Sequence, residues 1–272
     1  MHRRVGERLG RLLGGLLVLL ALPVAAQTPR IAVIIDDLGD RPADLAVADL
    51  PGPVTCAILP GSPMGRRIAE AAHAAGKEVI LHQPMQAVGD NAGGPRAVDL
   101  DMREHAVRRT VMANLAAIPH VAGLNNHRGS LITRHPGHMT WVMRLLAERG
   151  DLYFVDSRTT ADTVAERMAR EQRVPVVRRD VFLDNRREPA AIRERFAELL
   201  ERARRQGTAV AIGHPYPETI MVLREALARL ASRGVTLVPA SALTERMESE
   251  EETRQWHASW SPSPKAARSS KR

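Results

Sequence analysis

The chain has 272 residues, a formal net charge of +8 and only 3% aromatic residues. Proteins that bind nucleic acid single strands combine a basic surface with aromatic side chains for base stacking, so this scarcity argues against nucleic-acid binding despite the charge. Cys56 is the single cysteine, so no internal disulfide can form. Its position inside an apolar run is typical of a small core residue.

The first 26 residues have the organisation of a secretory signal peptide. Arginines precede an apolar stretch from Leu12 to Leu22, and the small residues Val24, Ala25 and Ala26 offer a cleavage site. We therefore expect export across the inner membrane to a bacterial periplasm, without stable membrane insertion after cleavage. The alternative is a retained anchor, because the apolar stretch is short for a membrane span but can lodge at the interface.

Between residues 27 and 247, short aliphatic runs alternate with longer amphipathic segments. The aliphatic runs predict strands, and segments with apolar residues about four positions apart predict helices. The expected strands cover residues 31–35, 54–59, 78–81, 121–124, 152–155, either 174–178 or 180–183, 208–213 and 235–238. The expected helices cover residues 63–75, 101–118, 136–149, 161–170, 189–206 and 217–233.

Alternating strands and helices are typical of βα units in a parallel sheet. Seven or eight such units in one chain favour a closed or nearly closed (β/α) barrel, and an open doubly wound sheet is the alternative. In the stretch 186–205, Arg alternates with Glu, which we interpret as solvated helix faces. Residues 248–272 contain an acidic cluster followed by Ser, Pro and Lys, a composition that predicts a disordered tail.

Five predicted strands end in side chains that can bind a metal or move a proton. Because the ends of parallel strands converge on one face, residues far apart in the sequence become neighbours there. The pattern therefore predicts one assembled site. In chain order, these strand-end residues are Asp36, Asp37, His82, Asn125, Asn126, His127, Asp156, Ser157 and His214.

Asp36 and Asp37 are the strongest signal, because adjacent carboxylates at a strand end repel each other unless a cation is present. Side chains alternate along a strand, so one Asp can bind a metal while the other faces a water beside it. An Asp ligand together with His82 and His127 leaves one coordination position open, as in catalytic zinc sites. The alternatives are a turn made by Asp before Gly39, and hydrogen-bonded structural histidines.

The other polar residues predict supporting roles. Asn125 and Asn126 either orient His127 or hydrogen-bond a polar substrate. His214 either donates a proton to a leaving group or caps the following helix. Further polar residues at the rim are expected to bind substrate or to tune His214, namely Asp156, Ser157, Arg158, Thr159 and Asp184. The alternative for the two aspartates is a cap on the next helix.

At these residues the sequence resembles the divergent polysaccharide deacetylases, a branch of the NodB-like carbohydrate esterases. The resemblance implies a distorted, NodB-like (β/α) barrel with about seven parallel strands, and metal-dependent hydrolysis of an N- or O-acetyl group on a sugar polymer. The matching segments occur in the family's order and are I-A-V-I-I-D-D-L-G (31–39), A-I-L-P (57–60), E-V-I-L-H-Q-P-M (78–85), N-N-H-R-G-S (125–130), F-V-D-S-R-T (154–159) and I-G-H-P-Y-P (212–217).

The resemblance also implies a role for each of four residues. Asp36 is the general base and His214 the general acid, and Asp37 and His82 are metal ligands. The family pattern places a second His four residues after the first, but here Gln86 stands at that position. We expect His127, from the next strand end, to supply the third ligand.

The sequence-based hypothesis is a periplasmic hydrolase that uses a divalent metal, most simply Zn²⁺, to remove acetyl groups from an envelope or extracellular polysaccharide such as a peptidoglycan-type glycan. One alternative is a catalytically impaired barrel of the same fold that binds glycan or protein. Another is metal-dependent hydrolysis of a different amide or ester.

Overall fold

The computed structural model describes residues 28–244. The predicted signal peptide (1–26) and tail (248–272) lie outside the described residues and stay predictions, as do the domain boundaries at 27 and 247. The strands are β1 (Arg30–Leu38), β2 (Thr55–Ile58), β3 (Glu78–Met85), β4 (Val121–Arg128), β5 (Tyr153–Asp156), β6 (Val176–Arg178), β7 (Val181–Phe182), β8 (Thr208–Gly213) and β9 (Thr236–Leu237).

The strands form one nine-stranded sheet of parallel pairs in the order β6-β5-β4-β3-β2-β1-β8-β7, with β9 beside β1. Apart from β9, neighbouring strands in the sheet are also neighbours in the chain, with β8 beside β1. The strands therefore follow one another around a circle that is open between β6 and β7. A cycle describes a curled barrel, whereas a doubly wound sheet reverses its order in the middle. The (β/α) barrel is thus confirmed, and the open-sheet alternative is wrong.

The opening between β6 and β7 is crossed by two residues. The Arg179 amide donates to the Asp156 carbonyl on β5, and the Asp180 amide donates to the Val210 carbonyl on β8. The chain therefore passes directly from one edge of the sheet to the other. Both candidate ranges for the sixth strand, 174–178 and 180–183, contain strands, which is one reason why the sheet has more than the seven expected.

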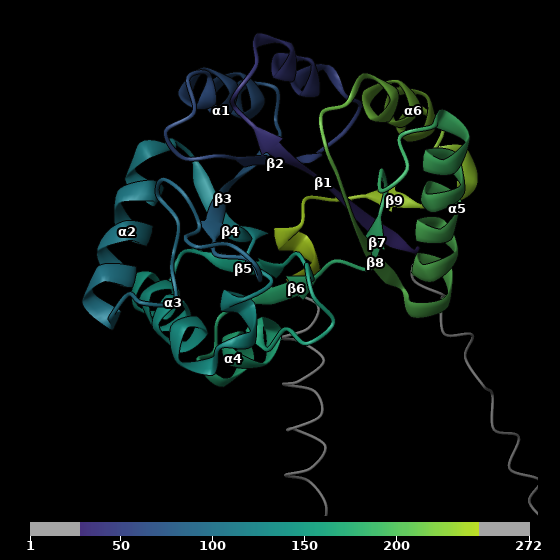
Figure 1. Ribbon diagram of the computed structural model, residues 1–272. Helices are drawn as coiled ribbons and strands as arrows, with labels where there is room; N and C mark the ends of the chain where they lie inside the picture. The colour runs from purple at the N-terminus through teal and green to yellow at the C-terminus, as the bar shows by residue number, and fades with distance from the viewer. Residues whose placement is uncertain (1–27, 245–272) are drawn as a thin grey trace, which may run out of the picture.

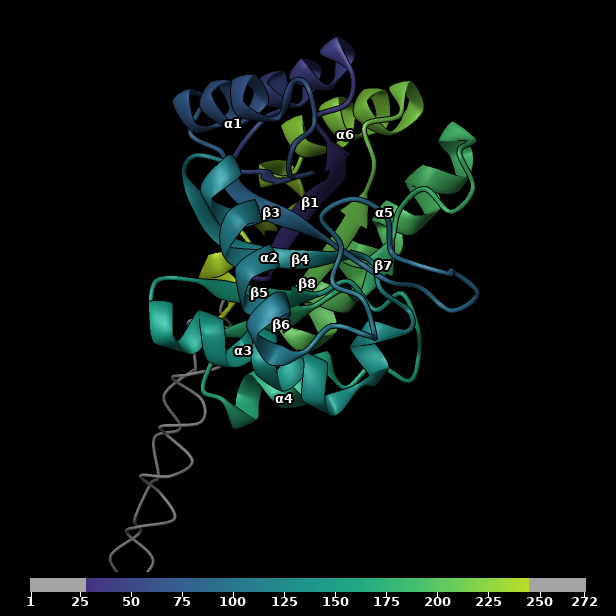
Figure 2. The same cartoon turned by 60° about the vertical axis from the view of Figure 1, so that its left-hand side comes forward.

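The helices surround the curled sheet (Figure 1). In the turned view α2, α3 and α4 lie side by side along its outside (Figure 2). Among the described residues, no helix combines the length and apolar character needed to cross a membrane. The α-helices are α1 (Gly65–Ala74), α2 (Glu104–Ala117), α3 (Pro136–Arg149), α4 (Ala165–Glu171), α5 (Pro189–Gln206) and α6 (Pro217–Ala228), and the 3-10 helices are η1 (Pro42–Asp49), η2 (Ile132–Arg134) and η3 (Ala231–Arg233).

Proline and glycine explain why the predicted bounds of two helices are confirmed. The α3 and α5 helices each begin with proline, whose fixed φ suits the first helical turn. Each ends before a glycine in the left-handed region, Gly150 (φ 74°) and Gly207 (φ 84°). The predicted helix 217–233 instead stops at Ala228 and continues as η3, and η1 was not predicted.

Strand side chains alternate between two apolar clusters. Ile31, Val33 and Ile35 pack in the large cluster under the helices, whereas Ala32 and Ile34 pack in a second cluster with alternate residues of β2, β3, β5, β6 and β8. Residues from so many strands of a curled sheet can meet only on its concave face, so the second cluster fills the barrel.

The segment after β9 closes the amino-terminal end of this barrel. Ala240 and Leu243 belong to the interior cluster. The Ala240 amide donates to Thr55 Oγ1, and the Ser241 amide donates to Glu78 Oε1, at the first residues of β2 and β3. The carboxyl ends of the strands are left for the polar residues.

Candidate metal centre and its cavity

An irregularity near the end of β1 directs both of its aspartates to one cavity. Between Ile35 and Leu38, β1 has one residue more than the segment of β2 that pairs with it. Asp37 takes a left-handed conformation, with φ 56°. A β-bulge of this kind re-aims side chains next to active sites. As a result Asp36 and Asp37 line the same cavity, although neighbours on a regular strand face opposite sides.

A second irregularity shifts the alternation of β4. Between residues 121 and 124, β4 has one residue more than β3 between residues 79 and 81. In this interval a Cβ on Gly123 would lie 2.6 Å from the ring of Tyr153, closer than real Cβ contacts come, so the position requires glycine. Beyond this bulge, Asn125 and His127 reach the site from β4.

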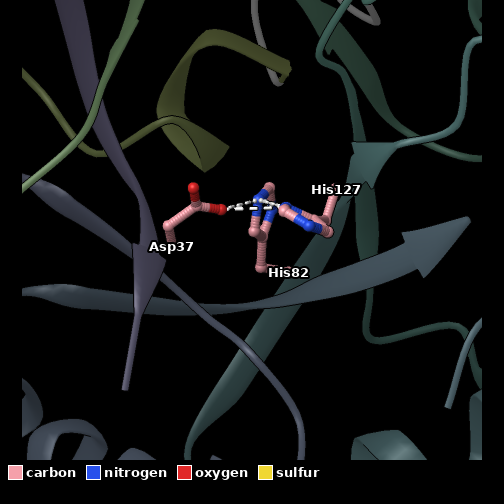
Figure 3. A group of neighbouring side chains, drawn as sticks. All are labelled: Asp37, His82 and His127. Carbon is pink, nitrogen blue, oxygen red and sulfur yellow. Dashed lines mark hydrogen bonds and ion pairs between the residues drawn. The ribbon is translucent and has the colours of Figure 1, made fainter. Parts of the chain in front are cut away.

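The predicted ligands Asp37, His82 and His127 come together from the carboxyl-terminal halves of β1, β3 and β4 (Figure 3). His82 lies inside β3, which continues to Met85 instead of ending at the predicted residue 81. Asp37 Oδ1 lies 3.0 Å from His82 Nε2 and 2.8 Å from His127 Nδ1. The two imidazole nitrogens are 3.1 Å apart. Three potential ligand atoms from three strands thus converge on one point.

Asn125 links His82 to Asp36. Its side-chain nitrogen donates to Asp36 Oδ1 at 2.8 Å, and its side-chain oxygen lies 2.7 Å from His82 Nδ1. An ionised carboxylate only accepts hydrogen bonds, so the amide oxygen must face His82 and accept the Nδ1 proton. In the neutral ring this leaves the Nε2 lone pair directed at Asp37 and His127. The structure thus places Asn125 on His82, not on His127 as one sequence-based alternative held.

The contacts between Asp37 and His82 shift the pKa of both residues. Burial opposes ionisation of Asp37, but hydrogen bonds from His127 and His82 outweigh it and lower its pKa. Burial opposes protonation of His82, yet the charge of Asp36 and the hydrogen bond with Asp37 raise the pKa of His82 to about 9. A proton on His82 is thus favoured by the carboxylates of Asp36 and Asp37.

The donor set fits a divalent metal. Zinc bonds of about 2.0–2.1 Å in a tetrahedral site separate ligand atoms by roughly 3.3 Å. The observed separations of 2.8, 3.0 and 3.1 Å are close to this value. One carboxylate with two imidazoles is also a zinc-type ligand set, and the Asn125 oxygen behind His82 is the outer partner that such a ligand requires.

Gln86 does not join this cluster. It is buried, its Nε2 donates to the Asp90 carbonyl, and its Oε1 accepts from the Leu100 amide. Gln86 therefore braces the loop that follows β3. The third potential ligand comes instead from β4, where His127 pairs in register with Pro84.

His214 faces Asp37 from β8, on the other side of the cluster. Its Nε2 lies 3.7 Å from Asp37 Oδ2, and its Nδ1 lies 2.9 Å from Asp184 Oδ1. Asp184 Oδ2 accepts from the His214 amide at 2.6 Å and from the Thr219 hydroxyl at 2.8 Å. Burial opposes protonation of His214, but the hydrogen bond and charge of Asp184 raise its pKa.

The remaining predicted residues brace the rim. Asn126 joins β4 to β5, because its Oδ1 accepts from the Ser157 amide and its Nδ2 donates to the Arg128 carbonyl. Asp156 does not line the cavity; its carboxylate accepts from the Arg158 amide and the Thr163 hydroxyl and so shapes the following loop. Ser157 and Asp36 do line the cavity. Burial raises the pKa of the Asp36 carboxyl group.

The cavity has a volume of about 790 Å³ and a basic wall of five arginines, of which the sequence reasoning had singled out only Arg158. Arg179 follows β6, so the strand-end rule that found the other residues also applied to it. The stretch 186–205 is only partly the solvated surface that was expected, because residues of it line the cavity. The cavity's arginines are Arg128, Arg158, Arg179, Arg186 and Arg195.

The chain belongs to the divergent polysaccharide deacetylase family, whose sequence profile matches residues 33–244. It is 38% identical over 226 residues to the uncharacterized protein YibQ of Escherichia coli K12, covering 83% of this chain and 70% of that protein. It is 36% identical over 202 residues to an uncharacterized protein of Haemophilus influenzae, covering 74% and 72%.

Among solved structures, the chain is similar to the uncharacterized protein ATU2773 of Agrobacterium tumefaciens C58. The TM-score is 0.77 and the sequence identity is 25%, over 80% of this chain and 90% of that one. The family is one of hydrolases that act on carbohydrate, which agrees with a barrel whose potential metal ligands lie in the carboxyl-terminal halves of its strands.

Proposed function

We propose that this protein is a metal-dependent hydrolase that removes acetyl groups from an envelope or extracellular polysaccharide. The observation that carries the proposal is the convergence of Asp37, His82 and His127 in one cavity, with Asp36 and His214 beside them. Zn²⁺ is the metal that the donor set favours. When bound, it would polarise the acetyl carbonyl and lower the pKa of a water.

Asp36 is the proposed general base. One of its carboxylate oxygens is occupied by the Asn125 amide, and the other lies 3.7 Å from His82. Burial raises its pKa, which makes the carboxylate a stronger base than an exposed Asp. In the proposed reaction Asp36 takes a proton from the water whose oxygen forms the new bond to the acetyl carbon.

His214 is the proposed general acid. Asp184 fixes its ring through Nδ1 and raises its pKa, so the protonated ring presents Nε2–H beside Asp37. As the bond between the acetyl carbon and the sugar nitrogen or oxygen breaks, His214 protonates the departing atom. The products are acetate and a free amine or hydroxyl on the glycan.

The periplasm is the proposed compartment, and the support for it is the amino-terminal sequence pattern. A glycan of the cell envelope would be accessible there. Fractionation of cells that produce the full-length chain tests this, because cleavage near residue 26 yields a shortened soluble protein, whereas a retained anchor keeps the full-length chain with membranes.

The test begins with the metal content of the mature protein, purified without a histidine tag, beside a His82→Ala/His127→Ala double variant. We expect near-stoichiometric zinc or another divalent metal in the wild type and its loss in the double variant. Asp36→Asn should keep the metal, because Asp36 is not among the three converging ligands, and should lower acetate release from an acetylated chito-oligosaccharide by roughly 10²–10⁴-fold.

Three results would count against this reading. Absence of metal in the wild type, even after incubation with zinc, contradicts the metal centre. Turnover of Asp36→Asn at the wild-type rate removes Asp36 as the base. Saturable binding of the oligosaccharide without acetate release, in protein that holds its metal, would favour the catalytically impaired binding barrel.

A further inference from the structure

The basic wall of the cavity contains two kinds of arginine. The three at the rim are paired with carboxylates: Arg128 with Asp90, Arg186 with Glu188, and Arg195 with Glu198. The other two, Arg158 and Arg179, have no carboxylate within salt-bridge distance among residues 28–244. Their charges are therefore available to a ligand in the cavity.

Arg179 is held in place by the loop that carries Arg158. Its Nε donates to the Ser157 carbonyl at 2.7 Å, and one terminal nitrogen donates to the Arg158 carbonyl at 2.7 Å. The guanidinium also lies 5.0 Å from the centre of the Phe182 ring. These contacts leave further N–H donors of Arg179 without a partner, since a guanidinium has five.

The two guanidinium groups are close enough to disfavour each other. Burial lowers the pKa of Arg179, and the positive charge of Arg158 lowers it further, while the charge of Asp36 acts in the opposite direction. Arg179 is thus near both Arg158 and the metal centre. Two partly buried like charges are costly unless an anion lies between or beside them.

Ser157 provides an independent sign of a missing partner. The residue is 4% exposed and lines the cavity, and its buried hydroxyl oxygen has no hydrogen-bond partner within residues 28–244. A buried hydroxyl without a partner is destabilising, so such groups mark places where a ligand or water completes the structure. Ser157 stands directly before Arg158, and its carbonyl is bound by Arg179.

We propose that Arg158, Arg179 and Ser157 form a subsite for an anionic group, a carboxylate or a phosphate, carried by the acetylated saccharide. This inference rests on the proposed function for the saccharide, but the charge recognition itself requires no turnover. Guanidinium groups bind both anions through paired, charge-assisted hydrogen bonds. An unsubstituted acetylated amino sugar is neutral and would give neither arginine a carboxylate or phosphate within salt-bridge distance.

The experiment compares saccharides that differ in one anionic group. N-acetylglucosamine is neutral, N-acetylmuramic acid adds a carboxylate, and N-acetylglucosamine 6-phosphate adds a phosphate. Their dissociation constants are measured by calorimetry on the mature protein, both metal-loaded and after chelation, because an anion can also bind a metal directly. We expect at least one anionic sugar to bind roughly 10- to 100-fold more tightly than the neutral sugar in both states. Raising the salt concentration should reduce this preference.

Arg158→Gln is the main variant, because the Arg158 guanidinium has no protein hydrogen bond in the described residues and its loss should leave the fold intact. It should abolish most of the preference while leaving the affinity for N-acetylglucosamine unchanged, and Arg158→Lys should restore part of it. Arg193→Gln is the matched control, since it removes one positive charge from an exposed pair with Glu225 on α5 and α6. The control should keep the full preference.

Equal affinity of the wild type for all three sugars would overturn the subsite. A preference that survives in Arg158→Gln would do the same. These results are separable from failure of the proposed function. If the anionic preference is present and depends on Arg158, but no acetate is released from any sugar, the subsite stands and the hydrolase does not. If a neutral sugar is deacetylated and bound as well as the anionic ones, the hydrolase stands and the subsite does not.

Discussion

Replacing Asn125 with alanine should weaken metal binding without removing any ligand. Asn125 is fully buried and holds two groups at once, Asp36 through its nitrogen and His82 through its oxygen. Alanine breaks both hydrogen bonds and leaves room for His82 to rotate. The proposed ligands Asp37 and His127 keep their own positions, so the effect isolates the orientation of a single imidazole.

The expected size follows from the two contacts. Loss of partners at 2.7 and 2.8 Å leaves one buried N–H and one buried carboxylate oxygen unsatisfied, at about 1–3 kcal/mol each. The metal-free protein should therefore lose roughly 2–6 kcal/mol of unfolding free energy. Outer partners of metal-bound histidines contribute 10- to 100-fold in affinity, so the dissociation constant for zinc should rise by about that factor.

The assay is competition for zinc with a chromophoric chelator, read beside urea unfolding of the metal-free protein. Asn126→Ala is the matched control. It removes an adjacent buried amide whose partners are the Ser157 amide and the Arg128 carbonyl, so it should lower stability but leave zinc affinity within about threefold. Unchanged zinc affinity in Asn125→Ala, or an equal loss in both variants, would refute the orienting role.

Two further predictions concern the bulge and the general acid. Gly123→Ala should destabilise the protein by about 1–3 kcal/mol in urea unfolding, because the added Cβ meets the Tyr153 ring. Gly137→Ala is the control: it lies on a helix with open space around it and should be neutral or stabilising. Equal stabilities of the two variants would contradict the role of the close approach at Gly123. Asp184→Asn removes the charge that raises the pKa of His214. An acid works only while protonated, so the alkaline limb of the rate-against-pH profile should move to lower pH, and an unshifted limb would argue against His214 as the acid.

The elements of this protein could be predicted well from local pattern. Alternation with period two and apolar spacing near four are properties of neighbouring residues, so the strands and the bounds of α3 and α5 follow from the chain alone. The same holds for which strand-end side chains lie together. Asp37, His82 and His127 were selected because parallel strands place their carboxyl ends on one face, and the structure brings them together.

Other features depend on contacts between segments distant in sequence. Nothing near Asp36 and Asp37 shows that β1 bulges there, because the bulge is defined only by its register with β2. The glycine of the β4 bulge is required by Tyr153, which lies thirty positions along the chain, on β5.

The basic wall of the cavity shows most clearly which features follow from the sequence and which depend on the tertiary structure. The sequence by itself determined that arginines follow β5 and β6 and alternate with glutamates along α5. Only the tertiary structure decided which of them keep a carboxylate partner, since the choice depends on how the chain crosses from β6 to β7 and where Arg179 then lies against Ser157 and Arg158. Side-chain types and periodicity are local, whereas pairing and burial of charge are set by the curled sheet as a whole.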